Sequence, residues 1–263
     1  MAIIALLSDF GLNDAYVGQM KAACLSHAPN ARLVDISHQV NPFNIIQGAF
    51  FLAATHHHLP AGAVVLAVVD PGVGTARRAV IARIDDRFYV APDNGLLSLA
   101  LQSSERIEAW ELPAPEHNGA STFHGRDVFA PAAAKLASGA DPSALGKPIR
   151  QQGLHRFERS LPRITRDGLV AHVMHIDRFG NCILNMPTRD WLPTLRDWTG
   201  ISLVAPARLP LTLARTYGEL PGSGLGLLPG SQDFLELALN RSSAKKFLDL
   251  RIGSLVRLAG GPA

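Results

Sequence analysis

Hydrophobic and polar positions follow different patterns in the two halves of the chain. In the first half, short and wholly apolar runs alternate with longer stretches in which apolar residues recur every three or four positions. A short continuous apolar run is typical of a strand covered on both faces, and the wider spacing is typical of a helix. This alternation predicts an α/β domain with a largely parallel sheet.

The elements of the first half can be placed by their residues. Strands are predicted at 3–7, 32–36, 63–69, 80–84 and 88–91, and helices at about 16–26, 44–55, 95–102 and 126–138. The run at 63–69 is the strongest strand because it is short, continuous and rich in β-branched residues. In the helix over 44–55, Ile45, Ala49 and Ala53 share one face. Asp14 is predicted to be the N-cap of the first helix.

The pattern changes after about residue 140. Residues 141–153 hold two prolines and two glycines and are interpreted as the beginning of a linker. Beyond Gly168, short apolar runs alternate with turn signals such as the Pro-Gly pairs at 221–222 and 229–230. These runs are predicted strands at 169–176, 182–185, 201–204, 234–239 and 255–258. We therefore predict an N-terminal α/β domain over residues 1–155 and a smaller all-β domain over 165–263.

Composition and charge exclude several classes of protein. With 47% hydrophobic and 18% charged residues among 263, the chain is too apolar for a disordered segment. A net charge of +3 produces only a weak field, and no run of five or more basic residues occurs, so no nucleic-acid partner is expected. No apolar run approaches the eighteen residues of a membrane span.

The N-terminal segment and the cysteines bear on the cellular compartment of the protein. The first eleven residues lack a basic region and a cleavage site and are interpreted as the first strand, not as a signal peptide. Two cysteines, Cys24 and Cys182, are too few for a disulfide framework or a four-cysteine zinc site. A reducing cytoplasm is the predicted location.

Three polar clusters stand where ligands bind in open α/β sheets, at the carboxyl ends of strands or at a helix start. They are SDFG at 8–11 with Asp14 after it, DPGVGTARR at 70–78, and STFHGRD at 121–127. Asp9 could hold a ribose diol or serve as a turn residue. Asp70 and Arg77 flank a tight turn and are predicted to form an ion pair, which could be only structural. The turn lacks the lysine and spacing of a phosphate loop.

Further candidates lie at a helix start, in the second half and in a histidine run. His124, beside a glycine at a helix start, is placed for acid–base or electrostatic work. DRFGN at 177–181 suits a ligand with an amine and a purine edge, or forms a β-turn. Tyr217 could stack on a base. The three histidines at 56–58 are interpreted as a surface helix terminus, not a metal site.

Taken together, the segments resemble the S-adenosylmethionine hydrolase family, also called SAM hydroxide adenosyltransferases, which is related to the bacterial fluorinase and chlorinase. Six motifs occur in the family's order: SDFG, DPGVGTxRR, PDNG at 92–95, STFHGRD, DRFGN and PGS…NxxSA. The resemblance implies an α/β domain followed by a barrel-like domain, a homotrimer with sites at subunit contacts, and hydrolysis of S-adenosyl-L-methionine to adenosine and methionine without metal or other cofactor.

The resemblance also implies roles for individual residues. Asp70, Arg77 and His124 would activate water, and Asp9 would hold the ribose diol. The methionine end would meet Asp14, Asp177 and Ser231, and the adenine would meet Asn181 and the backbone near Arg241. Asp93 and Asn94 of the PDNG motif complete the predicted binding set, together with Gln232, which stands where the fluorinase has an arginine.

Three other functions remain open at this point. The chain could transfer the adenosyl group to chloride or another anion, or could bind S-adenosylmethionine or adenosine without turnover. A metal hydrolase would use a set of carboxylates around one histidine, namely Asp9, Asp70, Asp93, His124 and Asp127. Scattered carboxylates with one histidine suit a transition metal poorly.

Overall fold

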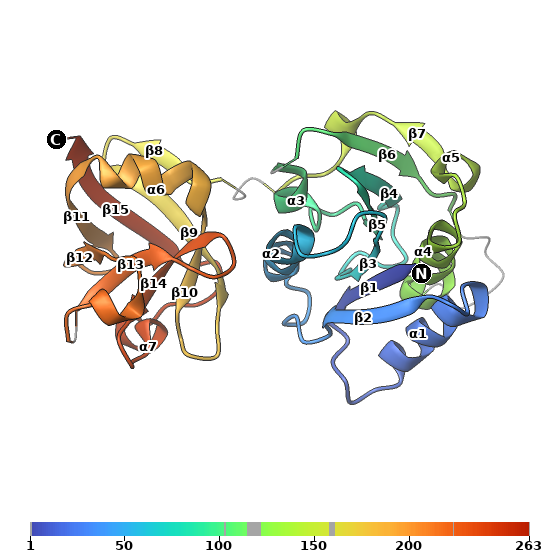
Figure 1. Cartoon of the computed structure of the whole chain (residues 1–263), viewed down its shortest axis with the longest axis horizontal. Helices are drawn as coiled ribbons and strands as arrows, with labels where there is room; N and C mark the ends of the chain where they lie inside the picture. Colours follow the sequence, from blue (N-terminus) through green and yellow to red (C-terminus); the bar gives the residue numbers. More distant parts are fainter. Residues whose placement is uncertain (1, 103, 115–121, 158–160, 223, 263) are drawn as a thin grey trace. The chain divides into compact units, whose positions relative to one another are not determined.

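The computed structural model describes residues 2–102, 104–114, 122–157, 161–222 and 224–262. The chain divides into two compact units, Met1–Phe157 and Glu158–Ala263 (Figure 1). The first unit is α/β and the second is a closed β-barrel with short helices, which confirms the predicted fold class. Ser121 of the STFHGRD motif lies outside the described residues.

The first unit is built on one seven-stranded sheet. In sheet order the strands are β2 (Arg32–Ser37), β1 (Ile3–Ser8), β3 (Val64–Val68), β5 (Arg87–Pro92), β4 (Ala79–Ile84), β6 (Ile107–Glu111) and β7 (Lys147–Ile149). The pairs from β2 through β5 are parallel, and β4 pairs antiparallel with both β5 and β6. Because β7 is antiparallel to β6, all strands except β4 and β7 run in one direction.

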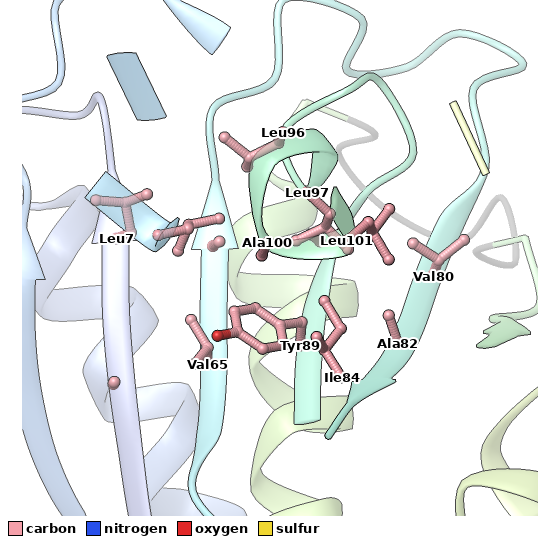
Figure 2. Packing of buried hydrophobic residues seen from close by; sticks show 14 of the residues in the cluster. Leu7, Val65, Val80, Ala82, Ile84, Tyr89, Leu96, Leu97, Ala100 and Leu101 are labelled. Atoms are coloured by element: carbon pink, nitrogen blue, oxygen red, sulfur yellow. The ribbon is translucent and has the colours of Figure 1, made fainter. Parts of the chain in front are cut away.

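Helices cover both faces of this sheet, which is why its central strands are apolar without alternation. The helical elements are α1 (Tyr16–His27), α2 (Ile45–His56), α3 (Ser98–Gln102), η1 (Gly125–Phe129), α4 (Ala130–Ala137), α5 (Pro142–Leu145) and η2 (Gln151–Gly153). Successive strand residues point to opposite faces, so Val65 joins the core under α2 and α3, and Val64 joins the core under α1 and α4. Figure 2 shows residues of the core under α2 and α3, among them Tyr89 of β5.

The parallel register brings two polar loops to one edge of the sheet. Ser8, the last residue of β1, lies opposite Val68 at the end of β3. The chain therefore leaves β1 into the SDFG turn and leaves β3 into the DPGVG turn on the same side. The neighbouring β5 ends at Pro92 and leads into the PDNG turn. The fold places these three motifs together.

The second unit is a seven-stranded barrel with one added strand. The order is β10 (Cys182–Pro187), β14 (Phe234–Leu239), β13 (Leu225–Pro229), β12 (Leu209–Leu213), β11 (Trp198–Ala205), β15 (Leu255–Pro262), β9 (Gly168–Ile176) and β8 (Arg163–Thr165). A further pairing between β10 and β9 closes the barrel. It also carries α6 (Thr188–Arg196), η4 (Tyr217–Glu219) and α7 (Ala244–Leu248). All five strands predicted in this half are confirmed.

Three local predictions are wrong. Residues 141–153 are not a linker, because they contain β7, whose Ile149 pairs with β6 in the first sheet. The helix predicted from residue 95 begins at Ser98, because Gly95 has a φ of +98°. Asp14 is exposed and is not an N-cap; α1 begins after Ala15 without a side-chain cap. The helix predicted at about 126–138 is confirmed as η1 followed by α4; its first turn is π-helical, since Pro131 has no N–H to donate to residue 127.

The histidine run at 56–58 also differs from its interpretation. The helix does end there, but His56 is fully buried while His57 and His58 are exposed. The His56 ring accepts a hydrogen bond at Nδ1 from the Tyr89 hydroxyl (2.6 Å) and donates from Nε2 to Asp85 Oδ2 (3.1 Å). His56 is a core residue in a satisfied polar network.

This network predicts a loss of stability in acid. Burial lowers the pKa of His56 in the folded state, with Asp85 opposing the shift, whereas an unfolded chain has the ordinary value near 6.5. Above that pH the ring is neutral in both states. As the pH falls through about 6.5, the unfolded chain binds a proton that the folded chain does not, so the free energy of unfolding decreases.

Urea unfolding at pH 8 and pH 5 measures this decrease. The His56→Gln variant should lose less stability between the two pH values than the wild type. His57→Gln, at the exposed neighbour, is the control and should retain the full difference. Equal pH dependence in all three proteins would contradict the role given to His56.

Among the described residues, no helix combines the length and the apolar character needed to cross a membrane.

Candidate active site

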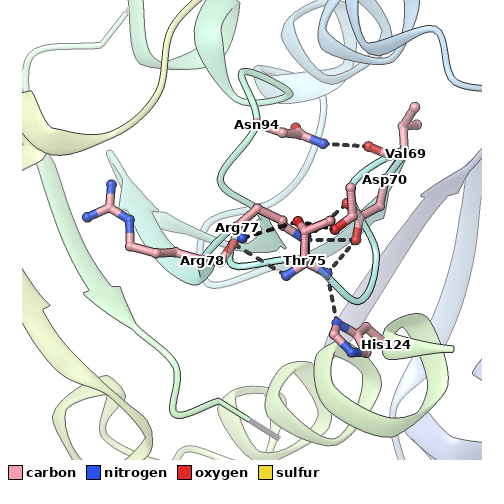
Figure 3. Close-up of polar contacts among 8 residues, drawn as sticks. Val69, Asp70, Thr75, Arg77, Arg78, Asn94 and His124 are labelled. Carbon is pink, nitrogen blue, oxygen red and sulfur yellow. Dashed lines mark hydrogen bonds and ion pairs between the residues drawn. The ribbon is translucent and has the colours of Figure 1, made fainter. Parts of the chain in front are cut away.

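Asp70, Arg77 and His124 form one hydrogen-bonded chain in the first unit. Arg77 Nε donates to both oxygens of Asp70 at 3.0 and 2.9 Å, and its Nη2 also donates to Oδ2. The same Nη2 donates to His124 Nδ1 at 2.8 Å. The side chains of Asp70 and Arg77 are only 4% and 11% exposed. The predicted ion pair is thus confirmed, and His124 extends it (Figure 3).

The turn between β3 and β4 explains why these side chains meet. Val73 N donates to the carbonyl of Asp70, and Thr75 N donates to the carbonyl of Gly72, which closes the loop tightly. Gly74 has a φ of +78°, a conformation that favours glycine. The loop therefore turns the chain back so that Arg77 faces the residue seven positions before it.

The partners of His124 determine its protonation state. A guanidinium can only donate, so Nδ1 must be an acceptor and the neutral ring carries its proton on Nε2. Burial lowers the pKa of His124, and the adjacent charge of Arg77 lowers it further against the opposing effect of Asp70. Nε2 is buried and has no hydrogen-bond partner among the described residues. The site therefore holds an unused N–H donor beside a fixed cation.

Aromatic rings pack beside this chain. Phe10 and Tyr16 contact Phe123 edge to face, with ring centroids 5.6 and 5.3 Å apart. A Cβ at Gly125 would lie 3.0 Å from the Phe123 ring and 3.3 Å from the Phe10 ring, so only glycine fits there without a shift. Arg77 also stacks over Phe129, 5.1 Å from its centroid. These aromatic contacts were not predicted from the sequence, because an aromatic residue near a turn gives no indication of which other ring it will contact in the fold.

Asp9 lies at the end of β1 in a held position. Its Oδ2 accepts a hydrogen bond from Phe43 N at 2.8 Å. Partial burial raises the pKa of Asp9, and the charge of Asp70 raises it further, against that hydrogen bond. Two contacts with His38 hold the SDFG turn in place. The Ser8 hydroxyl contacts His38 Nδ1 at 2.7 Å, and Gly11 N donates to the His38 carbonyl.

Asp93 and Asn94 have protein partners. Asp93 Oδ2 accepts from Arg78, and its Oδ1 accepts from His155 N at 2.7 Å. The Asn94 amide donates to the Val69 carbonyl at 2.9 Å, directly before Asp70. Figure 3 shows the Arg78 side chain pointing away from Asp70, unlike that of Arg77. The PDNG turn therefore braces the loop that carries the catalytic candidates.

In the second unit, most of the predicted residues line one cavity. Its volume is about 680 Å³, and its walls are Asp177, Phe179, Asn181, Tyr217, Ser231, Leu239, Arg241, Ser242 and Ser243. Gly180 has a φ of +86°, and a Cβ there would lie 2.1 Å from Ser243 Oγ, so the DRFGN turn needs this glycine. Gln232 is exposed and is not part of the wall. Asp14 is likewise exposed, in the first unit.

Within the ranges that the structure describes, no group of three or more His, Cys, Asp or Glu side chains is arranged to hold a metal ion. Of the five residues considered for a metal hydrolase, Asp93 pairs with Arg78 and Asp127 with Arg126, and the Asp70 carboxylate pairs with Arg77. These three carboxylates are therefore already paired with arginine side chains of the same polypeptide.

Both units match known sequence families. The family model of the SAM hydroxide adenosyltransferase N-terminal domain matches residues 4–146, and the model of the C-terminal domain matches residues 171–257. The chain is 42% identical to an (R)-S-adenosyl-L-methionine hydrolase of Thermus thermophilus over 98% of this chain and all of that protein. It is 30% identical to a fluorinase of Nocardia brasiliensis, over 98% and 97% of the two chains. An uncharacterized conserved protein of Thermotoga maritima has a similar structure, with a TM-score of 0.86, 30% identity, and 97% and 99% coverage.

Proposed function

The chain belongs to the SAM hydroxide adenosyltransferase family, and on that premise we propose that it hydrolyses S-adenosyl-L-methionine to adenosine and L-methionine. The observation that carries this proposal is the chain of Asp70, Arg77 and His124. These three side chains present the Arg77 cation and the Nε2–H donor of His124, which can stabilise the hydroxide that forms from water. None of the three is an unpaired nucleophile.

The reaction is a displacement at C5′ of the substrate. The sulfonium already supplies a neutral thioether as leaving group, so the protein must mainly provide the nucleophile and its alignment. The new bond joins the water oxygen to C5′, the C5′–S bond breaks with its electrons going to sulfur, and one proton leaves to solvent. Water has a pKa of about 15.7, so the developing hydroxide must be stabilised by positive charge and hydrogen-bond donors.

Each member of the chain has a distinct part in this step. Arg77 supplies the positive charge, and Asp70 holds the guanidinium in place through hydrogen bonds from Nε and Nη2. His124 acts as a fixed donor through Nε2–H, not as a base, because its other nitrogen already accepts from Arg77. The donor is preorganised, so little rearrangement is needed as charge develops on the oxygen.

The remaining predicted residues bind the substrate in this proposal. Asp9 accepts from the ribose diol, while Asn181 and the backbone near Arg241 meet the adenine. Asp14, Asp177 and Ser231 meet the methionine end, and Gln232 gives weaker carboxylate binding than an arginine would. Asp93 and Asn94 act indirectly, by holding the loop of Asp70 and Arg77.

We propose a homotrimer whose sites join the first unit of one subunit to the second unit of a neighbour. Exposed hydrophobic side chains flank both sets of residues and support a covering partner: Leu12 is 61%, Phe43 69% and Phe179 77% exposed. The two units correspond in this proposal to the predicted domains 1–155 and 165–263. Cys24 and Cys182 are buried free thiols, which supports action in a reducing cytoplasm. The absence of a nucleic-acid partner stays a prediction.

Product analysis in labelled water tests the reaction. In metal-free buffer made with H₂¹⁸O, the protein should convert S-adenosylmethionine to methionine and adenosine, with one ¹⁸O in the 5′-hydroxyl. C5′ should invert in a substrate made chiral there with deuterium, since the attack is direct. Retention would indicate a covalent adenosyl-enzyme intermediate and contradict this mechanism.

Further arms of the same experiment separate the alternatives. Adding chloride should leave the products unchanged; formation of 5′-chloro-5′-deoxyadenosine would identify a halide-using enzyme. Tight binding without any product over hours would identify a binding protein. Activity that appears only when a metal ion is restored would identify a metal hydrolase.

A further inference from the structure

A hydrogen-bonded chain connects three wall residues of the second unit's cavity to a buried carboxylate. Glu236 of β14 is only 5% exposed, and its Oε1 accepts a hydrogen bond from the Tyr217 hydroxyl. The Asn181 Nδ2 group donates to the Tyr217 oxygen at 3.3 Å and to Asp177 Oδ2 at 2.9 Å. We call these four residues the Glu236 chain. Glu236 itself is not a wall residue of the cavity and has no part in the reaction proposed above.

The number of protons in the Glu236 chain fixes the direction of every bond. An ionised carboxylate only accepts, so Glu236 and Asp177 each terminate the chain as acceptors. Tyr217 has one hydroxyl proton, which it donates to Glu236. Asn181 has two amide protons, which it donates to Tyr217 and Asp177. The amide therefore has no proton left for a ligand, and its remaining group is the Oδ1 acceptor.

A buried carboxylate destabilises the fold unless hydrogen bonds compensate it. Burial raises the pKa of Glu236, and the hydrogen bond from Tyr217 opposes this shift. Gly230 gives the carboxylate room, because a Cβ there would lie 2.5 Å from Glu236 Oε2. The barrel thus accommodates a charged side chain within the otherwise apolar β14, next to the loop that carries Ser231. A leucine at this position would fill the space without the cost of burying a charge. The carboxylate must therefore have a role other than packing.

We propose that Glu236 and Tyr217 are positioning residues that make the cavity select an aminopurine over an oxopurine. This inference rests on the proposed function, in which Asn181 meets the adenine. With both amide protons engaged, Asn181 offers only an acceptor, which pairs with the exocyclic amine of adenine. A 6-oxopurine places its own acceptor there, leaving two acceptors facing each other without a proton.

Binding of three nucleosides to the full chain measures this selection. Adenosine carries the 6-amine, inosine carries a 6-carbonyl, and purine riboside carries neither. Titration calorimetry on the wild type should show adenosine binding about a hundredfold more tightly than inosine, with purine riboside between them.

Two substitutions test the positioning roles. Tyr217→Phe frees one Asn181 proton, which can then meet the inosine carbonyl, so the preference for adenosine should fall about tenfold. Glu236→Leu should act in the same direction because the phenol loses its acceptor. Glu236→Gln should retain the preference, since its Oε1 can still accept from Tyr217. Tyr89→Phe, which removes a buried hydroxyl of the first unit, is the matched control and should leave the preference unchanged.

The possible results separate this inference from the proposed function. Equal binding of adenosine and inosine by the wild type would overturn the inference alone. An unchanged preference in Tyr217→Phe would do the same. Failure of the protein to bind any of the three nucleosides would overturn both. In S-adenosylmethionine turnover, Tyr217→Phe should raise KM and leave kcat within a few-fold, since the Glu236 chain does not touch the reacting atoms.

Discussion

Replacement of Arg77 by alanine should lower kcat for S-adenosylmethionine hydrolysis about a hundredfold or more, while KM changes only a few-fold. The guanidinium acts on charge that develops on the water oxygen, and that charge is small in the bound ground state. The variant also releases His124 from its donor at Nδ1, so the ring no longer has a fixed proton on Nε2. Steady-state kinetics with chromatographic detection of adenosine measures both parameters.

Arg78→Ala is the matched control, one position along the same loop. Arg78 pairs with Asp93 and with the Gly153 carbonyl, and not with Asp70. Its removal leaves the 5% exposed Asp93 carboxylate without its cation and should destabilise the fold by on the order of 2 kcal/mol. Below the melting temperature, kcat should stay within a few-fold of the wild type, because the loop keeps its hydrogen bond from Asn94 to the Val69 carbonyl and its own backbone hydrogen bonds. Equal losses of kcat in the two variants would show that the functional arginine is misassigned.

The ion pair between Asp70 and Arg77 could be predicted because it follows from rules that act locally, whereas His124, 47 positions from Arg77, was joined to the pair only through the family resemblance. An apolar run of β-branched residues ends at Val69, and parallel strands carry their ligands at the carboxyl ends. The tight turn between β3 and β4 could be predicted from Pro71, Gly72 and Gly74. The ion pair across it needed no information about distant parts of the chain.

Other assignments depended on which side chain meets which across the fold, and the sequence could not supply this. Asp93, like Asp70, stands in a glycine-containing turn directly after a strand of the parallel part of the sheet, but its oxygens accept hydrogen bonds from Arg78 and from His155 N. His56 stands beside two exposed histidines, yet the helix position turns it into the core against Tyr89. Glu236 left one signal, as the only charged residue of a buried apolar strand, but its partner Tyr217 lies nineteen positions away.

Mixed assemblies should recover activity from two variants that are each impaired, if each site is shared between subunits. Arg77→Ala damages the first unit and Asp177→Ala removes a wall residue of the cavity in the second. The two variants are co-expressed with different affinity tags and purified on both tags in turn, so that every trimer recovered contains both kinds of subunit. Each variant is also purified alone, and its melting temperature verifies that it folds.

The shared-site arrangement gives a definite yield. In a ring of three, each site takes its first unit from one subunit and its second unit from the next. A site is intact only where an Asp177→Ala subunit is followed by an Arg77→Ala subunit. Going once around a ring with two subunits of one kind and one of the other, this order occurs once, whichever variant is in the majority. Doubly purified trimers should therefore show about a third of wild-type kcat per subunit.

If each site lay within one chain, every site would carry one of the two lesions, and mixing would restore nothing. That second result, with trimers confirmed by native mass spectrometry, would overturn the shared site while the labelling experiment could still support the chemistry.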